Sequence, residues 1–182
     1  MTLFANPQYN RNENGYIKVP TDPEMCSTAW ERAKALGALN HSIRGGTGNL
    51  VGYLGQMAVE KAIVGMKRED TYDYDLIYDD NGEKRTADVK TKDRTIFPLP
   101  HYECSISEYN TEQATDYYIF ASTYRIVGTY DYSLVFVLGY IEKTEYFKKA
   151  RFLQKGDIDP SNNFAVRANC YNLAIKDLLL FE

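Results

Sequence analysis

One charged face of a short strand holds the residues of this chain that are best suited to chemistry. Residues 86–92, TADVKTK, alternate between small or apolar and charged side chains. Because side chains alternate across a β-strand, Asp88, Lys90 and Lys92 are expected on the same face. A solvent-facing strand with weak ion pairs would show the same pattern. The functional interpretation therefore depends on what lies beside this strand.

The segment before it supplies a second carboxylate. Residues 72–78 also have the composition of a strand, and the Asn-Gly pair at 81–82 predicts a tight hairpin turn between the two strands. Counting back from that turn places Asp75 opposite Asp88, so two carboxylates should converge. Hard divalent cations such as Mg²⁺ prefer paired oxygens, and the carbonyl of Val89 could supply another.

The neighbouring lysine suggests which reaction such a cation would assist. Next to a bound metal ion and a phosphate, Lys90 could orient a water molecule, help it lose a proton and offset charge in the transition state. The metal ion would lower the pKa of that water and polarise a phosphoryl oxygen. These parts predict metal-assisted hydrolysis of a phosphodiester, with Mg²⁺ as cofactor and Mn²⁺ as its substitute.

The elements that must position these residues predict an α/β domain in which helices flank a mixed β-sheet. A helix over 49–65 is apolar on most sides and should be central, and Gly52 and Gly55 on one side of it would permit close approach of a neighbour. Other helices are predicted over 21–39, 107–115 and 143–150. Strands are predicted over 16–19, 116–123, 132–141, 151–157 and 170–175, and 96–105 is predicted to be a loop.

Composition limits the class of protein. The chain has 182 residues with 44% hydrophobic and 25% charged residues, which predicts one soluble globular domain over 1–182, with 1–20 as an N-terminal extension. No apolar run approaches the roughly 20 residues that a membrane helix needs, and the N-terminus does not have the pattern of a signal peptide. Three widely spaced cysteines favour reduced thiols in a cytosolic compartment.

The net charge of −4 weighs against a passive, sequence-neutral binder of nucleic acid, but not against an enzyme with a local basic groove. Such a groove could be formed by a basic cluster around the second strand of the hairpin, made of Lys84, Arg85, Lys90, Lys92 and Arg94.

The order of these segments resembles the PD-(D/E)XK nuclease superfamily. The matching segments are GYLGQMAVEKAI, YDYDLIY and ADVKTKDR. The later helix and strands are similar to those of small members from phages and bacteria, so the resemblance covers roughly residues 25–180. It implies a restriction-endonuclease-like fold and an Mg²⁺-dependent hydrolase of nucleic acid. DNA is favoured as the substrate and an endonuclease as the activity, in the cytoplasm of a bacterial or phage-infected cell.

The resemblance also implies roles position by position. Asp75 would be the first metal carboxylate, Asp88 the second, and Lys90 the catalytic lysine. Gln113 matches a glutamine that some members place beside the site. Asp73 is an alternative to Asp75, because the two would share a strand face.

One position departs from the pattern of the superfamily. The first helix of these nucleases often carries GxxGE, whereas this chain has GYLGQ, so Gln56 stands where an acid is expected. Glu60 lies one helical turn later and could supply the missing carboxylate to the metal. It could equally be a solvated partner of Lys61 or Lys67. We expect Gln56 to face the site, with two acids sufficing for the principal metal ion.

Phosphate contacts are expected from Lys92, Arg94 and Arg44, with DNA as the partner, no membrane association, and a homodimer left open. Two alternatives remain. One is the same fold with impaired chemistry, which would bind nucleic acid or a protein partner, and Gln56 is the feature that favours it. The other is an unrelated α/β structural protein whose D-V-K sequence is a surface feature.

Overall fold

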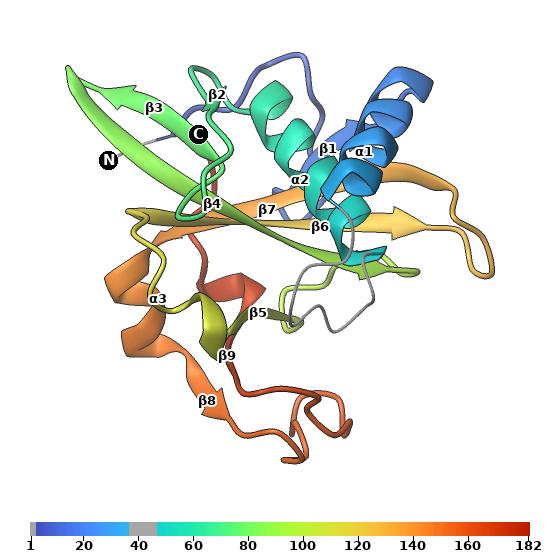
Figure 1. Cartoon of the computed structure of the whole chain (residues 1–182), viewed down its shortest axis with the longest axis vertical. Helices are drawn as coiled ribbons and strands as arrows, with labels where there is room; N and C mark the ends of the chain where they lie inside the picture. The colour runs from blue at the N-terminus through green and yellow to red at the C-terminus, as the bar shows by residue number, and fades with distance from the viewer. Residues whose placement is uncertain (1–2, 37–46) are drawn as a thin grey trace.

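A six-stranded mixed sheet forms the centre of the computed structural model, which describes residues 3–36 and 47–182 (Figure 1). The strand order is β1-β7-β6-β4-β3-β2. Only β4 and β6 run parallel among these neighbours. The strands are β1 (Ile17–Pro20), β2 (Lys67–Arg68), β3 (Leu76–Asp80), β4 (Glu83–Arg94), β6 (Tyr117–Arg125) and β7 (Tyr132–Glu142).

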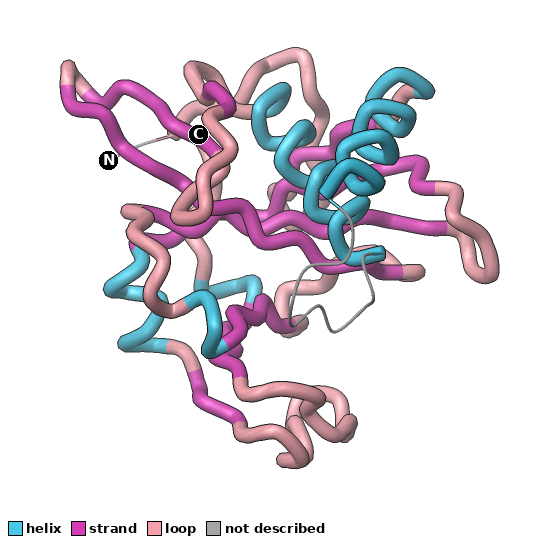
Figure 2. Tube along the Cα trace, in the orientation of Figure 1, coloured by secondary structure: helices cyan, strands magenta, loops and turns pink. Residues whose placement is uncertain are grey.

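Both faces of this sheet are covered (Figures 1 and 2). Helices α1 (Pro23–Leu36) and α2 (Thr47–Ala62) pack on one face, and each face has its own apolar core. The other face carries helix α3 (Lys143–Lys149) and a small sheet of β5 (Glu103–Ser107), β9 (Cys170–Ala174) and β8 (Arg151–Leu153). Burial on both sides explains why β6 and β7 are almost continuously apolar. The predicted single α/β domain with a mixed sheet is confirmed.

The hairpin of β3 and β4 forms with the expected turn. Asn81 and Gly82 both have positive φ, 57° and 88°, as the tight turn of a two-residue hairpin requires. The register pairs Leu76 with Ala87, which places Asp75 opposite Asp88 just before β3 begins. Strand β3 begins at Leu76, opposite Ala87, whereas β4 continues past Ala87 to Arg94. One edge of β4 is therefore left without a partner strand beside Asp75.

The first strand of the hairpin starts later than the sequence predicts. Residues 71–74 form a turn in which the Thr71 hydroxyl accepts the backbone N–H groups of Asp73 and Tyr74. Local side-chain bonds of this kind compete with strand pairing. The Asp73 carboxylate accepts the N–H of Ala114 instead of lying on a strand face with Asp75. The expectation that Asp73 and Asp75 share a strand face was therefore wrong.

Helix α2 lies unusually close to β4. A Cβ atom on Gly55 would stand 1.8 Å from the Thr91 hydroxyl oxygen, so only glycine allows this approach. The predicted close contact is confirmed at Gly55. It is wrong at Gly52, which has open space around its Cβ position and faces a pocket. The approach at Gly55 brings the next residue, Gln56, to the edge of β4.

Long-range pairing accounts for the main differences from the predicted elements. Part of the expected loop 96–105 is strand β5, which pairs with β9 in a register of Glu103 with Ala174. The expected helix over 107–115 is only a 3₁₀ turn, η1 (Glu108–Asn110), and a second one, η2 (Ile175–Asp177), follows β9.

The N-terminal segment belongs to the body of the fold rather than extending from it. Leu3 is 4% exposed and lies in the core, and the Ala5 N–H donates to the Glu182 carbonyl at 2.6 Å. Strand β1 is an edge strand of the main sheet. In the described part of the chain, no helix has the length and apolar character needed to span a membrane.

Candidate active site

An open pocket of about 620 Å³ lies where β4 continues beyond the start of β3. Its walls come from α2, from the loop before β3, from the open edge of β4 and from the turn after η1. Two of these segments belong to one hairpin, and the fold brings α2 and the turn after η1 to it. Its lining includes Gln56, Asp75, Asp88, Lys90 and Gln113.

The Asp75 carboxylate is held between the helix and the strand edge. One oxygen accepts the Gln56 side-chain amide at 2.5 Å, and the other accepts the Val89 backbone N–H at 2.8 Å. The Asp75 N–H donates to the Ala87 carbonyl at 3.1 Å, which fixes the backbone. Because the N–H and C=O of one strand residue point to the same edge, the Val89 carbonyl also lies on the Asp75 side.

Asp88 and Lys90, on β4, form an ion pair in the same pocket. The Lys90 ammonium lies 2.6 Å from an Asp88 carboxylate oxygen, and Asp88 is only 3% exposed. The same ammonium donates to the Gln113 side-chain carbonyl at 3.0 Å. Gln113 is itself fixed, because its side-chain amide donates to the Tyr72 carbonyl at 2.7 Å and its backbone carbonyl accepts from the Lys143 ammonium at 2.5 Å. Gln113 therefore positions the lysine head group.

Burial and mutual repulsion control the charge on the two acids. Burial, reinforced by the negative charge of Asp88, raises the pKa of Asp75 to about 7. Burial also raises the pKa of Asp88, against the opposing effect of the Lys90 charge. The metal-free pair therefore does not carry two full negative charges near neutral pH. A bound cation would favour the fully ionised form.

The oxygen donors around the pocket suit a hard divalent cation. Asp75 and Asp88 offer carboxylates, and the Val89 carbonyl lies on the same edge. The Gln56 amide nitrogen faces Asp75, while its amide oxygen is buried and accepts no hydrogen bond from the described residues, so the amide could turn this oxygen toward a cation beside Asp75. Within residues 3–36 and 47–182, no three His, Cys, Asp or Glu side chains gather as a ligand set. Two carboxylates with solvent are enough for Mg²⁺, which usually keeps several waters.

Glu60 does not reach this pocket. Its carboxylate lies 2.5 Å from the Arg68 guanidinium of β2, and Glu60 is absent from the pocket lining. Gln56 and Glu60 differ by about 40° in direction around the helix and by one turn in height. This difference is enough to place them among different neighbours. Glu60 is therefore not placed to bind a metal ion in this pocket. The ion-pair partner of Glu60 is Arg68 rather than Lys61 or Lys67.

Lys92 and Arg94 are turned into the molecule rather than toward an open groove. The face of β4 that carries them is covered by β5. The Arg94 guanidinium donates to the Glu103 carbonyl at 3.1 Å and lies 5.0 Å from the centre of the Tyr102 ring. Their predicted contact with phosphates along an exposed groove does not fit this placement. Arg44, the third predicted contact, lies outside the described residues.

The remaining members of the predicted basic cluster are also engaged. Lys84 pairs with Glu69 at 2.7 Å, and Arg85 pairs with Glu83 at 2.9 Å, both far along β4 from the pocket. The expectation of one continuous basic groove was therefore wrong. Glu69, which follows β2, and Glu83, at the start of β4, neutralise these outer cations.

Several residues of the pocket were missed from the sequence, among them Tyr53, Tyr72 and Asp70. Tyr53 lies one turn before Gln56 on α2, and helical spacing from Gln56 could have identified it. Tyr72 contributes the carbonyl that holds Gln113, and Asp70 lies on the same loop with a positive φ of 50°. The sequence analysis expected a strand over 72–78, whereas local hydrogen bonds of Thr71 fold residues 71–74 into the turn that places Tyr72 and Asp70 at the pocket.

The raised pKa of Asp75 predicts a pH-dependent stability. Between its ordinary value of 3.8 and about 7, the folded state holds a proton that the unfolded state has released. The free energy of unfolding of the metal-free protein should therefore fall as pH rises through this range. Asp75→Asn removes the ionisation, so it should match the wild type near pH 4 and exceed its stability by up to a few kcal/mol at pH 8.

Urea denaturation in EDTA at several pH values measures this difference. Asp73→Asn is the matched control, because it removes a carboxylate from the same loop but outside the pocket. A gap between Asp75→Asn and the wild type that stays constant from pH 4 to pH 8 would contradict the raised pKa.

Known proteins do not add to this description. No protein family, curated protein or solved structure matches the chain. The chemistry of the site must therefore be argued from its own residues.

Proposed function

We propose that this chain is an Mg²⁺-dependent nuclease that hydrolyses phosphodiester bonds in DNA. The observation that carries the proposal is the convergence of Asp75 and Asp88 at the open edge of β4, with Lys90 beside them in one pocket. Two carboxylates and an ammonium in such an arrangement supply both a cation site and a group that can act on a phosphate.

The residues of the pocket divide the work. Asp75, Asp88 and the Val89 carbonyl would hold Mg²⁺, which when bound supplies a Lewis acid for the attacking water and the phosphoryl oxygen. Lys90 is within reach of the same space and can orient water and offset negative charge that develops on the phosphate. Its position is set by Asp88 on one side and Gln113 on the other.

A second function, binding without cleavage, is favoured by one specific observation. Gln56 contacts Asp75 at the point where a third carboxylate would complete a stronger cation site. A pocket with two acids could hold nucleic acid through a weakly bound cation without cleaving it. The experiment below separates this function from the first.

Incubation of supercoiled and linear DNA with purified protein tests the proposal. Cleavage is expected with Mg²⁺ or Mn²⁺ and not with EDTA. Ca²⁺ should bind without supporting turnover, because it is larger and less exacting in its geometry. Retarded migration of DNA without cutting would support the binding function. Full activity in EDTA would contradict metal-dependent catalysis, and nicking of a closed circle would distinguish an endonuclease from an exonuclease.

A further inference from the structure

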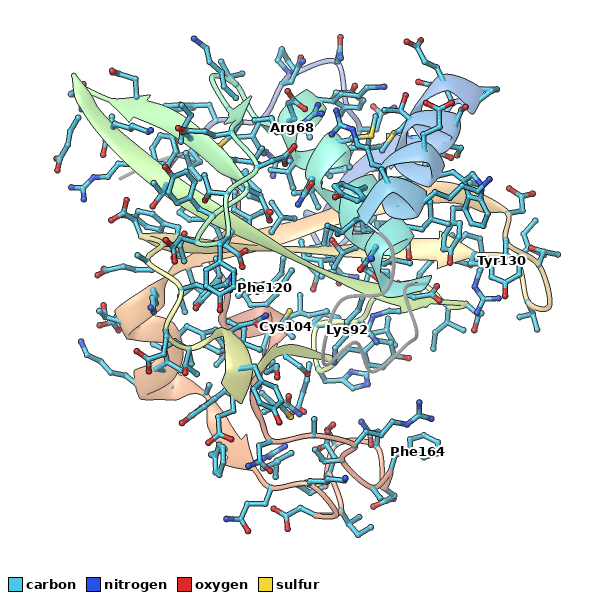
Figure 3. All side chains as sticks on the ribbon, in the orientation of Figure 1. Arg68, Lys92, Cys104, Phe120, Tyr130 and Phe164 are labelled. Carbon is cyan, nitrogen blue, oxygen red and sulfur yellow. The ribbon has the colours of Figure 1, made fainter. Side chains whose placement is uncertain are left out.

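A second, smaller cavity lies next to the candidate active site. It has a volume of about 100 Å³ and is partly enclosed between β4, β5, β6 and β7. Lys92, Arg94 and Ser105 supply its polar lining, and Phe120 contributes to its apolar wall. Lys92, Cys104 and Phe120 lie in the layer between the main sheet and the small sheet (Figure 3). Lys90 borders both this cavity and the larger pocket.

The two cations of this cavity carry donors without acceptors. The Lys92 side chain is largely enclosed, and its ammonium makes no hydrogen bond or ion pair with any described residue. Burial lowers the pKa of this group, as expected for a lysine without a counter-charge. The Arg94 Nε–H is buried and also lacks an acceptor within the described ranges. An unpaired buried charge costs free energy, so such donors usually face a partner that satisfies them.

The nearby acidic groups do not satisfy these donors. The Glu103 carboxylate is bonded to Arg151 at 2.8 Å and to the Asn172 amide at 2.7 Å. Cys104 lies in the wall of the cavity, and burial raises the pKa of its thiol to about 12, so it stays neutral. Apart from Lys90, which pairs with Asp88, the cavity therefore presents two basic side chains and a hydroxyl group, and none of the described residues that line it is a carboxylate.

We propose that this cavity binds a phosphate group, which accepts hydrogen bonds from Lys92, Arg94 and the Ser105 hydroxyl. A tetrahedral oxyanion can accept from several donors at once, and charge-assisted bonds of this kind are strong. A phosphate would also supply the negative counter-charge that Lys92 lacks among the described residues.

The cavity lies beside the pocket proposed to cleave DNA. A role of the cavity in binding DNA rests on that proposed function. Lys90 and Lys92 are two residues apart, about 7 Å along the strand. A polynucleotide whose phosphate lies at Lys90 could therefore place a neighbouring or terminal phosphate at Lys92. Binding of phosphate itself does not depend on cleavage.

Titration with inorganic phosphate in EDTA tests the site directly. The wild type should show a saturable rise in melting temperature and a heat of binding by calorimetry, compared with chloride at equal ionic strength. Lys92→Met should weaken binding about tenfold or more, because it removes one charged donor. Lys176→Met removes an exposed lysine and should bind as the wild type does. Lys92→Gln serves as a second variant in case the methionine variant does not fold.

Oligonucleotides identify the source of the phosphate. With Ca²⁺ and no turnover, tighter binding of strands with a 5′- or 3′-phosphate than of strands with hydroxyl ends, lost in Lys92→Met, supports a terminal phosphate. Equal weakening of all strands by Lys92→Met supports an internal phosphodiester. An effect confined to inorganic phosphate supports a free anion.

Phosphate binding by the wild type no stronger than that of chloride, or unchanged in both Lys92 variants, would overturn the proposal. Saturable, Lys92-dependent binding by a protein that never cuts DNA would leave the phosphate site standing while refuting the nuclease function. The two proposals can therefore fail separately.

Discussion

Replacing Asp88 by asparagine should lower Mg²⁺-dependent cleavage of DNA by about 100-fold or more while the fold stays intact. Asparagine has nearly the same volume, so the buried position remains filled. Its neutral amide is a much weaker ligand for Mg²⁺ and no longer offsets the Lys90 charge, which lies 2.6 Å from the Asp88 carboxylate. Asp88→Asn should therefore weaken cation binding and also release the Lys90 ammonium from its fixed position.

Lys90→Ala should cause a loss of similar size for a different reason. It removes the ammonium but leaves both carboxylates and the Val89 carbonyl on the strand edge. Cation binding should therefore survive, and the loss should fall on turnover. Titration with Mn²⁺ or Ca²⁺ separates the two variants, because Asp88→Asn should weaken cation binding and Lys90→Ala should not.

Two substitutions outside the pocket serve as matched controls. Asp73→Asn removes a carboxylate from the adjoining loop, and Lys84→Ala removes an exposed lysine from the same strand as Lys90. Both should retain cleavage close to that of the wild type. Wild-type rates in both Asp88→Asn and Lys90→Ala would refute the assignment of this pocket, and equal losses in the controls would point to a general effect of charge.

The part of the site that could be predicted from the sequence is the part that forms locally. The Asn-Gly turn at 81–82 fixes the register of the hairpin, and the register alone places Asp75 opposite Asp88. The glycine at 55 marks a close approach of helix and strand, which brings Gln56 to the same edge. Short-range rules of turn, register and helix periodicity were sufficient for these residues.

The environment of the rest of β4 could not be predicted in the same way. Lys92 and Arg94 were placed on the correct face of the strand, but that face is covered by β5, whose partner β9 lies about 70 residues later in the chain. No local pattern shows that a charged face will be covered. The sequence therefore suggested an exposed groove where the structure has an enclosed cavity. Gln113 likewise reaches Lys90 only through a turn that depends on long-range packing.

Gln56 is the residue whose role the structure makes most specific. Its amide nitrogen donates to Asp75 at 2.5 Å, and its buried amide oxygen has no partner in the described part of the chain. Rotation of the amide by half a turn would place that oxygen beside the Asp75 carboxylate, where a bound cation could bridge the two oxygens. The positions of the amide nitrogen and oxygen are assigned from the hydrogen bonds that they make. In one orientation the amide nitrogen donates to Asp75, and in the other the amide oxygen could contact a cation.

Gln56→Ala should therefore reduce cleavage about tenfold. The loss is smaller than for Asp88→Asn because the amide is neutral and both carboxylates remain. Gln56→Glu should preserve or raise activity and should tighten cation binding, since it adds a third carboxylate beside Asp75. In EDTA it should lower the free energy of unfolding, because like charges then meet in a buried space.

Glu60→Ala is the matched comparison, one helical turn away. It breaks the ion pair with Arg68 at 2.5 Å, a partly exposed contact that should contribute about 1 kcal/mol or less to stability, and it should leave cleavage nearly unchanged. Initial rates with Mg²⁺, cation titrations and urea denaturation of the three variants test this set. Loss of cleavage in Glu60→Ala with a harmless Gln56→Ala would mean that Glu60 is the third acid and that α2 is rotated in the active state. Wild-type behaviour of both alanine variants would confine the chemistry to the hairpin, because the helix would then contribute only its close packing at Gly55.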